Sequence, residues 1–317
     1  MTAGSTRAGR GRTLPGRAAH LLRDRNFLLI SSLVLGLVVG KGARATSWLN
    51  LPVMALAMTV SLTGISSGDF SSWRRVARFV LAALTLTYII NGGLLLLLGK
   101  LLISDPQLWI GLVLLAATPS GIAAIPFSYV LGGDASFALV GTVGAYLAAI
   151  AVMPLLATAL LGSAVIEPVR LVTTLVQLVV VPLVVSRAIN ATRLKEPISR
   201  WRGTIVNWSF ALIIFTVIGL NRDALLQQPQ VVLTLALIGL ATNFGLGWAL
   251  EKVLRWRHVG RATMLTSVIL GTVKNTSLTA ATILALLGER ASLPAAMVSV
   301  TNVLYLVFLG VHWGERK

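Results

Sequence analysis

The chain has 317 residues, of which 56% are hydrophobic and only 12% are charged. Since soluble domains carry about 25% charged residues, this balance excludes an ordinary soluble protein and indicates an integral membrane protein. The formal net charge of +17 comes from basic residues in short gaps between apolar runs, so it predicts topology signals and no nucleic-acid partner. The absence of cysteine excludes disulfides, thiolate metal sites and thiol nucleophiles.

The first segment, residues 1–25, holds six arginines and no apolar run. We expect a disordered cytoplasmic tail here. The Arg-rich, acid-poor composition leaves an organelle transit peptide as the alternative. A secretory signal is excluded, because the apolar stretch that starts at Phe27 has no small-residue cleavage site and further apolar stretches follow it.

Ten apolar stretches follow, and each is a candidate for a membrane-spanning helix, which needs about 17–25 residues. The sequence therefore predicts an all-α integral membrane protein, with a first five-helix repeat at 26–161, a second at 162–313 and a cytoplasmic tail at 314–317. The predicted spans are 27–43, 48–67, 79–99, 109–131, 136–161, 169–190, 203–220, 230–251, 262–287 and 294–313.

The basic residues test this arrangement, because cytoplasmic loops are enriched in Lys and Arg. With the N-terminus inside, 20 of the 27 Lys and Arg residues fall in inner segments and six fall in outer loops. The remaining one, Lys274, lies near the middle of the ninth span, and no Asp, Glu or His lies at comparable depth. We predict a multi-pass protein of the plasma membrane with both termini in the cytoplasm.

The fourth and ninth spans each contain an interruption. Pro119 and Pro126 flank Gly121 in the fourth, and each proline removes a backbone donor. In the ninth, Lys274 precedes a polar run, Asn275-Thr276-Ser277, that can cap a new half-helix. Because these are the fourth members of two five-span halves, we predict inverted repeats whose broken helices four and nine cross at the bilayer midplane. The alternative is that the prolines only bend their helices.

The same two spans resemble the bile acid:sodium symporter family. The matching residues are Pro119-Ser120-Gly121, Ser128-Tyr129 and Gly133-Asp134 in the fourth span, Asn275-Thr276-Ser277-Leu278 in the ninth, and Pro294-Ala295-Ala296 at the start of the tenth. The resemblance implies ten helices in a panel domain and a core domain. It also implies transport of organic anions, such as bile acids, sulfated steroids or smaller carboxylates, driven in most members by sodium.

Most of the family's sodium ligands are absent. In ungapped alignment, the family's acidic residue in span nine falls on Leu270 and its glutamine falls on Lys274. Since a desolvated sodium ion needs several hard oxygen ligands, we predict no sodium binding at the family's positions. The arsenite exporters of the superfamily use a cysteine in span four, and this chain has none. The positions of the remaining sodium ligands are Ala124, Ile125, Ala138 and Thr142, of which only Thr142 carries a side-chain oxygen.

Lys274 must face the protein interior, because a charge at the centre of a span costs about 2.5–3.5 kcal/mol and this one lies too deep to reach the headgroups. Its ammonium can replace sodium among unwound carbonyls, or bind the anionic group of the substrate, helped by a half-helix N-terminus. We favour these two roles in combination. One alternative is a lysine that loads and releases a proton in each transport cycle. The other is a lysine that lies in a water-filled vestibule and has no functional role. The candidate substrate- or ion-binding residues are Pro119, Ser120, Gly121, Pro126, Ser128, Thr142, Lys274, Asn275, Thr276 and Ser277.

Other polar residues at membrane depth are expected to hydrogen-bond between helices rather than to bind a ligand. They include Asn91, Tyr146, Gln177, Asn207, Asn243 and Asn302.

The sequence thus predicts a secondary transporter of a small organic anion that works by alternating access without sodium coupling, cofactor or metal. Its partners are the anion and the lipid bilayer. A proton-coupled or uncoupled exporter or facilitator of the same fold is the alternative, and a non-transporting membrane sensor or scaffold is the alternative of another class. An enzyme is not expected, because no nucleophile with a base, paired carboxylates or metal-ligand cluster lies at a wet site.

Overall fold

The computed structural model describes residues 25–63, 72–162 and 167–314. Within these residues the chain is helical and has no strand, apart from one antiparallel backbone bridge between Ser120 and Lys274. The predicted all-helical class is therefore confirmed for this part of the chain. The predicted tail at 1–25 lies outside the described residues except for Arg25, and the tail at 314–317 lies outside them except for Gly314.

The helices follow one another in the order of the predicted spans. The first described stretches contain α2 (Arg25–Val38), η1 (Gly40–Gly42), α3 (Ala43–Thr46), η2 (Ser47–Leu49), α4 (Asn50–Leu62), α5 (Trp73–Leu84), η4 (Thr85–Gly92), α6 (Gly93–Leu102), α7 (Pro106–Ala117), α8 (Ala124–Val130) and α9 (Ala135–Leu161). The last contains α10 (Pro168–Leu175), η5 (Val176–Val180), α11 (Val181–Asn190), α12 (Lys195–Leu220), α13 (Arg222–Gln227), α14 (Pro229–Leu240), η6 (Ala241–Gly245), α15 (Leu246–Trp256), α16 (Arg261–Thr272), α17 (Thr276–Leu286) and α18 (Glu289–Gly314). Of these, η4, η5 and η6 are π-helical turns inside longer helices.

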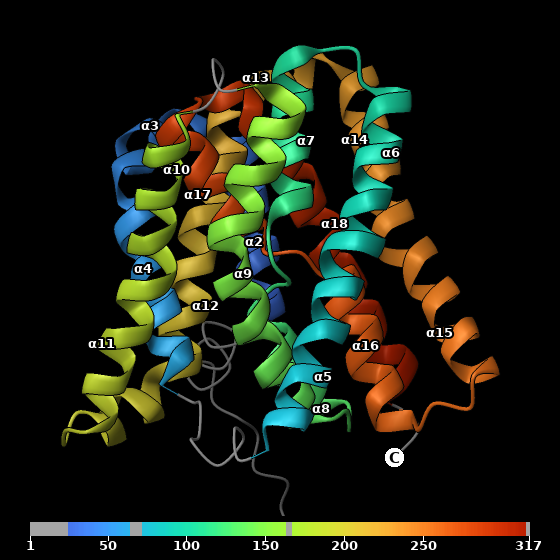
Figure 1. Cartoon of the computed structure of the whole chain (residues 1–317). Helices are drawn as coiled ribbons and strands as arrows, with labels where there is room; N and C mark the ends of the chain where they lie inside the picture. Colours follow the sequence, from blue (N-terminus) through green and yellow to red (C-terminus); the bar gives the residue numbers. More distant parts are fainter. Residues whose placement is uncertain (1–24, 64–71, 163–166, 315–317) are drawn as a thin grey trace, which may run out of the picture.

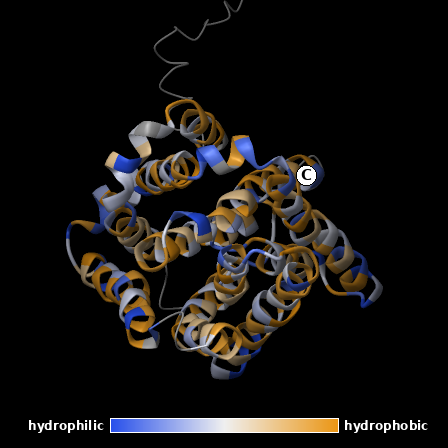
Figure 2. Cartoon of the chain, turned by 90° about the horizontal axis from the view of Figure 1, so that it is seen from above, coloured by the Kyte–Doolittle hydropathy of each residue, from blue (hydrophilic) through white to orange (hydrophobic). Residues whose placement is uncertain are grey.

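Seven helical runs among the described residues are long and apolar enough to cross a bilayer. Three shorter apolar helices, Phe27–Val38, Pro106–Ala117 and Thr276–Leu286, overlap the predicted spans one, four and nine. Large apolar side chains also point outward, for example Ile89 and Leu155, which are 70% and 69% exposed. Figure 2, viewed along the helices, shows apolar residues around the perimeter as well as inside. A surface of this kind is suited to lipid, so the protein is a multi-pass membrane protein.

The helices form two groups, and Figure 1 shows α4 and α11 of the first on the left and α14 and α15 of the second on the right. In the first, which we call the panel group, α12 packs against α2 and α4, and α11 packs against α4. In the second, the core group, α18 packs against α7, α14 and α17, α5 packs against α9, and α15 packs against α16. An apolar cluster joins the groups, with Met54 and Phe210 from the panel group and Ala281 and Ala295 from the core group.

Local sequence explains where the helices of the core group begin and end. The side chain of Asp105 accepts from the N–H of Gln107 at 2.8 Å and caps α7, and Asp134 accepts from Phe137 and caps α9. Helix α7 ends at Ala117, and Thr118 is extended because it precedes Pro119. Pro126 lies in the first turn of α8, where its missing N–H costs nothing.

Candidate functional site

The two segments that interrupt predicted spans four and nine contact each other through their backbones. Residues 118–123 separate α7 from α8, and residues 273–275 separate α16 from α17. The N–H of Gly121 donates to the carbonyl of Val273 at 2.8 Å, and the N–H of Asn275 donates to the carbonyl of Pro119 at 2.9 Å. Backbone groups that no longer have helical partners therefore satisfy one another. We call this contact the crossover.

Lys274 lies in the crossover, and its ammonium is bound by backbone carbonyls. Nζ donates to the carbonyl oxygens of Thr87, Ala116 and Thr118, at 2.8 Å in each case. An ammonium group has three N–H donors, so all three are used. The whole residue is only 3% exposed. Nζ also lies 5.3 Å from the centre of the Tyr88 ring, a distance at which a cation is attracted to the ring face.

These three carbonyls are available because the helices that carry them are irregular. Ala116 and Thr118 lie at the C-terminus of α7, where the last carbonyls have no partner within the helix. Thr87 lies in the π-helical turn η4, which interrupts the regular bonding pattern of the α-helix. The hydroxyl of Tyr88 donates to the carbonyl of Ala145 at 2.6 Å and so fixes its ring beside Lys274. Partial negative charge from two helices thus surrounds one positive charge.

The end of α16, by contrast, is capped by neutral amides. Asn91 donates to the carbonyl of Gly271 at 2.8 Å, Asn243 donates to that of Thr272 at 2.9 Å, and Asn302 donates to that of Lys274 at 2.9 Å. All three asparagines are at most 5% exposed. Asn91 lies in η4 and Asn243 in η6, and Asn243 also donates to Asn302 at 2.7 Å. The asparagines therefore form a network that connects three helices to the crossover.

Asn275 starts α17 from within the crossover. Its side-chain oxygen accepts from the N–H of Leu278 at 3.0 Å, which makes it the N-cap, and its amide nitrogen donates to the hydroxyl of Tyr146. Thr276 and Ser277 follow in the first turn, and both residues line a neighbouring cavity. The polar run predicted to begin a half-helix therefore begins α17.

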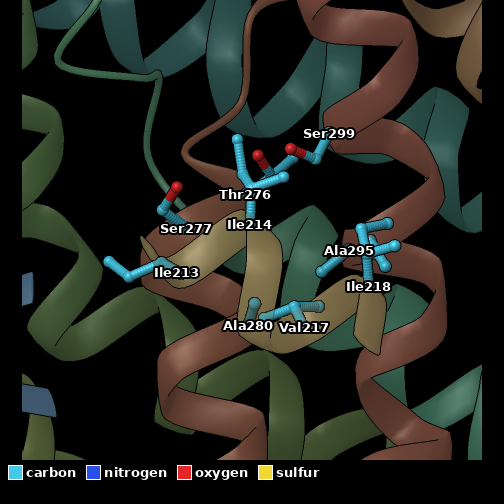
Figure 3. A pocket seen from close by; sticks show the side chains of 10 residues that line it. Ile213, Ile214, Val217, Ile218, Thr276, Ser277, Ala280, Ala295 and Ser299 are labelled. Atoms are coloured by element: carbon cyan, nitrogen blue, oxygen red, sulfur yellow. The ribbon is translucent and has the colours of Figure 1, made fainter. Parts of the chain in front are cut away.

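Two cavities lie between the crossover and the panel group. The larger, of about 50 Å³, is lined by Lys274, Asn302, Leu29 and Phe210 among others. The smaller, of about 10 Å³, is lined by Val217, Ile218, Ala280 and Ala295 among others. Both are also lined by Ile214 of α12 and by the hydroxyl-bearing residues Thr276, Ser277 and Ser299. Figure 3 shows these three hydroxyl-bearing side chains beside Ile214.

Most of the candidate site residues meet at the crossover, and three do not. Pro119, Ser120 and Gly121 lie in it, next to Lys274 through Ser277. Pro126 is an exposed residue of α8. Ser128 in α8 and Thr142 in α9 are buried, and their hydroxyl oxygens find no hydrogen-bond partner among the described residues.

Several residues of the site are not part of any recognisable sequence motif. Thr87 contributes only a carbonyl, which every residue possesses, so no residue type could indicate it. Asn91, Asn243 and Asn302 were visible as amides at membrane depth, and they do bond between helices as expected. Their convergence on the end of α16 depends on the packing. In the described part of the chain, no group of three or more His, Cys, Asp or Glu side chains is placed to hold a metal.

Comparison with known families adds a finding to this geometry. The sequence model of the sodium bile acid symporter family matches residues 51–228. The chain is a member of that family. The match includes the interruption at 118–123 and ends before the one at 273–275. No curated protein matches the chain. Members of this family are membrane transporters rather than enzymes, so the molecule acts on a small-molecule substrate within a bilayer.

Proposed function

We propose that this family member is a secondary transporter of a small organic anion that works by alternating access without sodium coupling. The observation that carries the proposal is the binding of the Lys274 ammonium by three backbone carbonyls at 2.8 Å. Carbonyl oxygens are also the ligands that a hard metal cation takes. The ammonium therefore occupies the place of a coupling ion, and it cannot leave because it is covalently part of the chain.

The architecture that we propose for this function is the one predicted from the sequence. Ten membrane-spanning helices form two inverted repeats, 26–161 and 162–313, and the interrupted fourth and ninth spans cross at the bilayer midplane. The backbone bonds between Gly121 and Val273 and between Asn275 and Pro119 support this arrangement. The positive-inside rule favours an orientation with both termini in the cytoplasm, and we propose the plasma membrane as the location.

The substrate contact is assigned to hydroxyl groups rather than to Lys274 itself. Every N–H of its ammonium already has an acceptor, so none is left for a carboxylate or sulfonate. Thr276, Ser277 and Ser299 line both cavities, so their hydroxyl groups are the donors that we propose for an anion that enters when the two helix groups move apart. Lys274 then attracts the anion only through its charge. Of the two roles predicted for Lys274, we therefore propose the replacement of sodium and no longer propose direct binding of the substrate.

A proton-coupled cycle through Lys274 is disfavoured by the number of hydrogens. A neutral amine has two N–H groups, so deprotonation would leave one of the three buried carbonyls without a donor. A stranded buried acceptor costs about 1–3 kcal/mol. The lysine is therefore proposed to keep its charge throughout the cycle.

Transport into proteoliposomes tests the proposed function. Labelled taurocholate and pyruvate, one large and one small organic anion, are offered in sodium buffer and in choline buffer. We expect uptake of at least one of them to be equal in both buffers and to be lost in Lys274→Met. Lys100→Met, which removes an exposed lysine, is the matched control and should transport normally. Strict sodium dependence with normal activity of Lys274→Met would overturn the proposal, and uptake of neither anion would favour a sensor or scaffold.

A further inference from the structure

We propose that transport by this protein is electrogenic and that the membrane potential drives the anion out of the cell. This inference rests on the function proposed above, and it adds the driving force and the direction. It follows from the charges at the crossover, from the size of the two cavities and from the distribution of basic residues.

The crossover carries one positive charge that stays with the protein. The ammonium of Lys274 is bound by the carbonyls of Thr87, Ala116 and Thr118, which all belong to the core group. Its attachment to the chain means that it returns with the core helices after each cycle. Unlike a bound sodium ion, it is not released on either side. It therefore adds nothing to the net charge that is moved.

No other group in the described part of the site changes the net charge that is moved in one cycle. The groups that cap α16 are the neutral amides of Asn91, Asn243 and Asn302. Six of the seven acidic residues that the structure describes lie at N-caps or in first turns, and Glu251 in α15 pairs with Arg255 at 2.6 Å. A monovalent anion near Lys274 thus neutralises the loaded site. The net charge moved in one cycle is that of the anion alone.

A potential acts on this charge in one direction. For one elementary charge and about 100 mV, it contributes a free energy that corresponds to a concentration ratio of about 50-fold. With the inside negative, the anion is driven outward. A protein of this kind therefore exports its substrate unless the anion is far more concentrated outside.

The two cavities agree with loading from the inside. With both termini in the cytoplasm, α12 runs outward and α18 runs inward. The cavity of about 50 Å³ then includes Phe210, Val303 and Leu306 toward the inner ends of these helices. The cavity of about 10 Å³ includes Ile218 and Ala295 toward their outer ends. More space is therefore open on the inner side of Ile214.

Basic residues gather at the same end. Figure 1 shows the start of α5 and the connection between α15 and α16 at the lower end of the molecule, the inner end in this orientation. A positive surface raises the local concentration of anions and speeds their entry. The exposed basic residues of these segments are Arg74, Arg75, Arg78, Lys252, Arg255, Arg257 and Arg261.

Flux under a clamped potential tests the inference. Sodium-free proteoliposomes are loaded with labelled taurocholate or pyruvate, and valinomycin with potassium gradients sets the interior at about −100, 0 or +100 mV. We expect the steady-state ratio of outside to inside anion to rise about 50-fold between zero and −100 mV and to reverse at +100 mV. A pH gradient at zero potential should leave the ratio unchanged. Protein-free vesicles correct for leakage.

The outcomes separate this inference from the function on which it rests. Sodium-independent flux with a ratio that ignores the potential, or that follows the pH gradient, would overturn electrogenic export and leave a sodium-independent transporter. Flux that appears only when sodium is added would overturn the proposed function and this inference with it. Flux of neither anion above the protein-free vesicles would do the same.

Discussion

Helices α7 and α16 both end at the crossover, and their last carbonyls are satisfied in different ways. These carbonyls belong to buried residues and have no partners within their helices. At α7, a single cation bonds to the carbonyls of Ala116 and Thr118. At α16, neutral amides bond to the carbonyls of Gly271, Thr272 and Lys274. The end of α7 therefore depends on one nitrogen atom, Nζ of Lys274, whereas three asparagine side chains bond to the end of α16.

The difference shows how a buried charge can be kept without a carboxylate. A cation at both ends would bring two like charges together at the crossover, which is costly at low dielectric constant. Amides supply donors without charge, so the second end adds no repulsion. The crossover thus carries a single positive charge. When that charge is removed, the end of α7 should lose its hydrogen bonds to Lys274, and the end of α16 should keep its bonds to the asparagines.

The largest effect is expected from Lys274→Met. This change removes all three donors and leaves the carbonyls of Thr87, Ala116 and Thr118 buried without partners. Each stranded buried carbonyl costs about 1–3 kcal/mol, so we expect a loss of stability of about 3 kcal/mol or more. Thermal unfolding of the purified protein measures it, with Lys100→Met as the matched control. Equal melting of Lys274→Met and the wild type would show that the end of α7 does not depend on this atom.

Alanine substitutions at one glycine in α7 and one in α16 compare how closely the two helices are packed. A Cβ added at Gly111 of α7 would lie 2.1 Å from the backbone carbonyl oxygen of Ala291, which cannot move aside. A Cβ at Gly271 of α16 would lie 2.7 Å from the end of the Leu250 side chain, which can rotate away. We expect Gly111→Ala to cost about 3 kcal/mol and Gly271→Ala about 1 kcal/mol. Denaturation of the two variants side by side measures the difference, and the reverse order would contradict this packing.

Removal of one asparagine from the amide network should reduce the stability of the protein less than Lys274→Met does. Asn243→Ala takes a donor from the carbonyl of Thr272 and leaves the hydroxyl of Thr301 and the amide of Asn302 with fewer partners. We expect a loss of about 1–3 kcal/mol, below that of Lys274→Met, because Asn91 also donates to Thr272 at 3.3 Å. Gln177→Ala, at an exposed amide of η5, is the control. A loss that matches Lys274→Met would remove the contrast between the two ends.

The smallest effect is expected at the start of α7. Partial burial raises the pKa of Asp105, but hydrogen bonds from Arg290 and from the N–H groups of Leu108 and Gln107 outweigh it and lower that pKa below its ordinary value. This stability is present above the ordinary pKa of 3.8 and is lost as the pH falls through the lower folded value. Since the pair is partly exposed, Arg290→Gln should cost less than about 1 kcal/mol at neutral pH. Unfolding at several pH values should show the difference from the wild type vanish in acid, and a difference that persists there would contradict this assignment.

The sequence predicted the helical membrane class and the family, and both are confirmed. It indicated that Lys274 faces the interior, because no carboxylate lies at its depth and the headgroups are out of reach. It could not indicate Thr87, since a carbonyl partner has no residue type and depends on how η4 packs against the crossover. Asn91, Asn243 and Asn302 were expected to bond between helices, and only the packing shows that they meet at the end of α16. The division into two inverted five-helix repeats stays a prediction.

The central claim is that the Lys274 ammonium takes the place of a coupling ion. Binding of radioactive sodium to the purified protein, measured by scintillation proximity with excess unlabelled sodium as the competitor, tests it most directly. We predict no saturable binding by the wild type, because the carbonyls at the crossover are already occupied. Saturable sodium binding by the wild type, displaced by unlabelled sodium, would contradict the account.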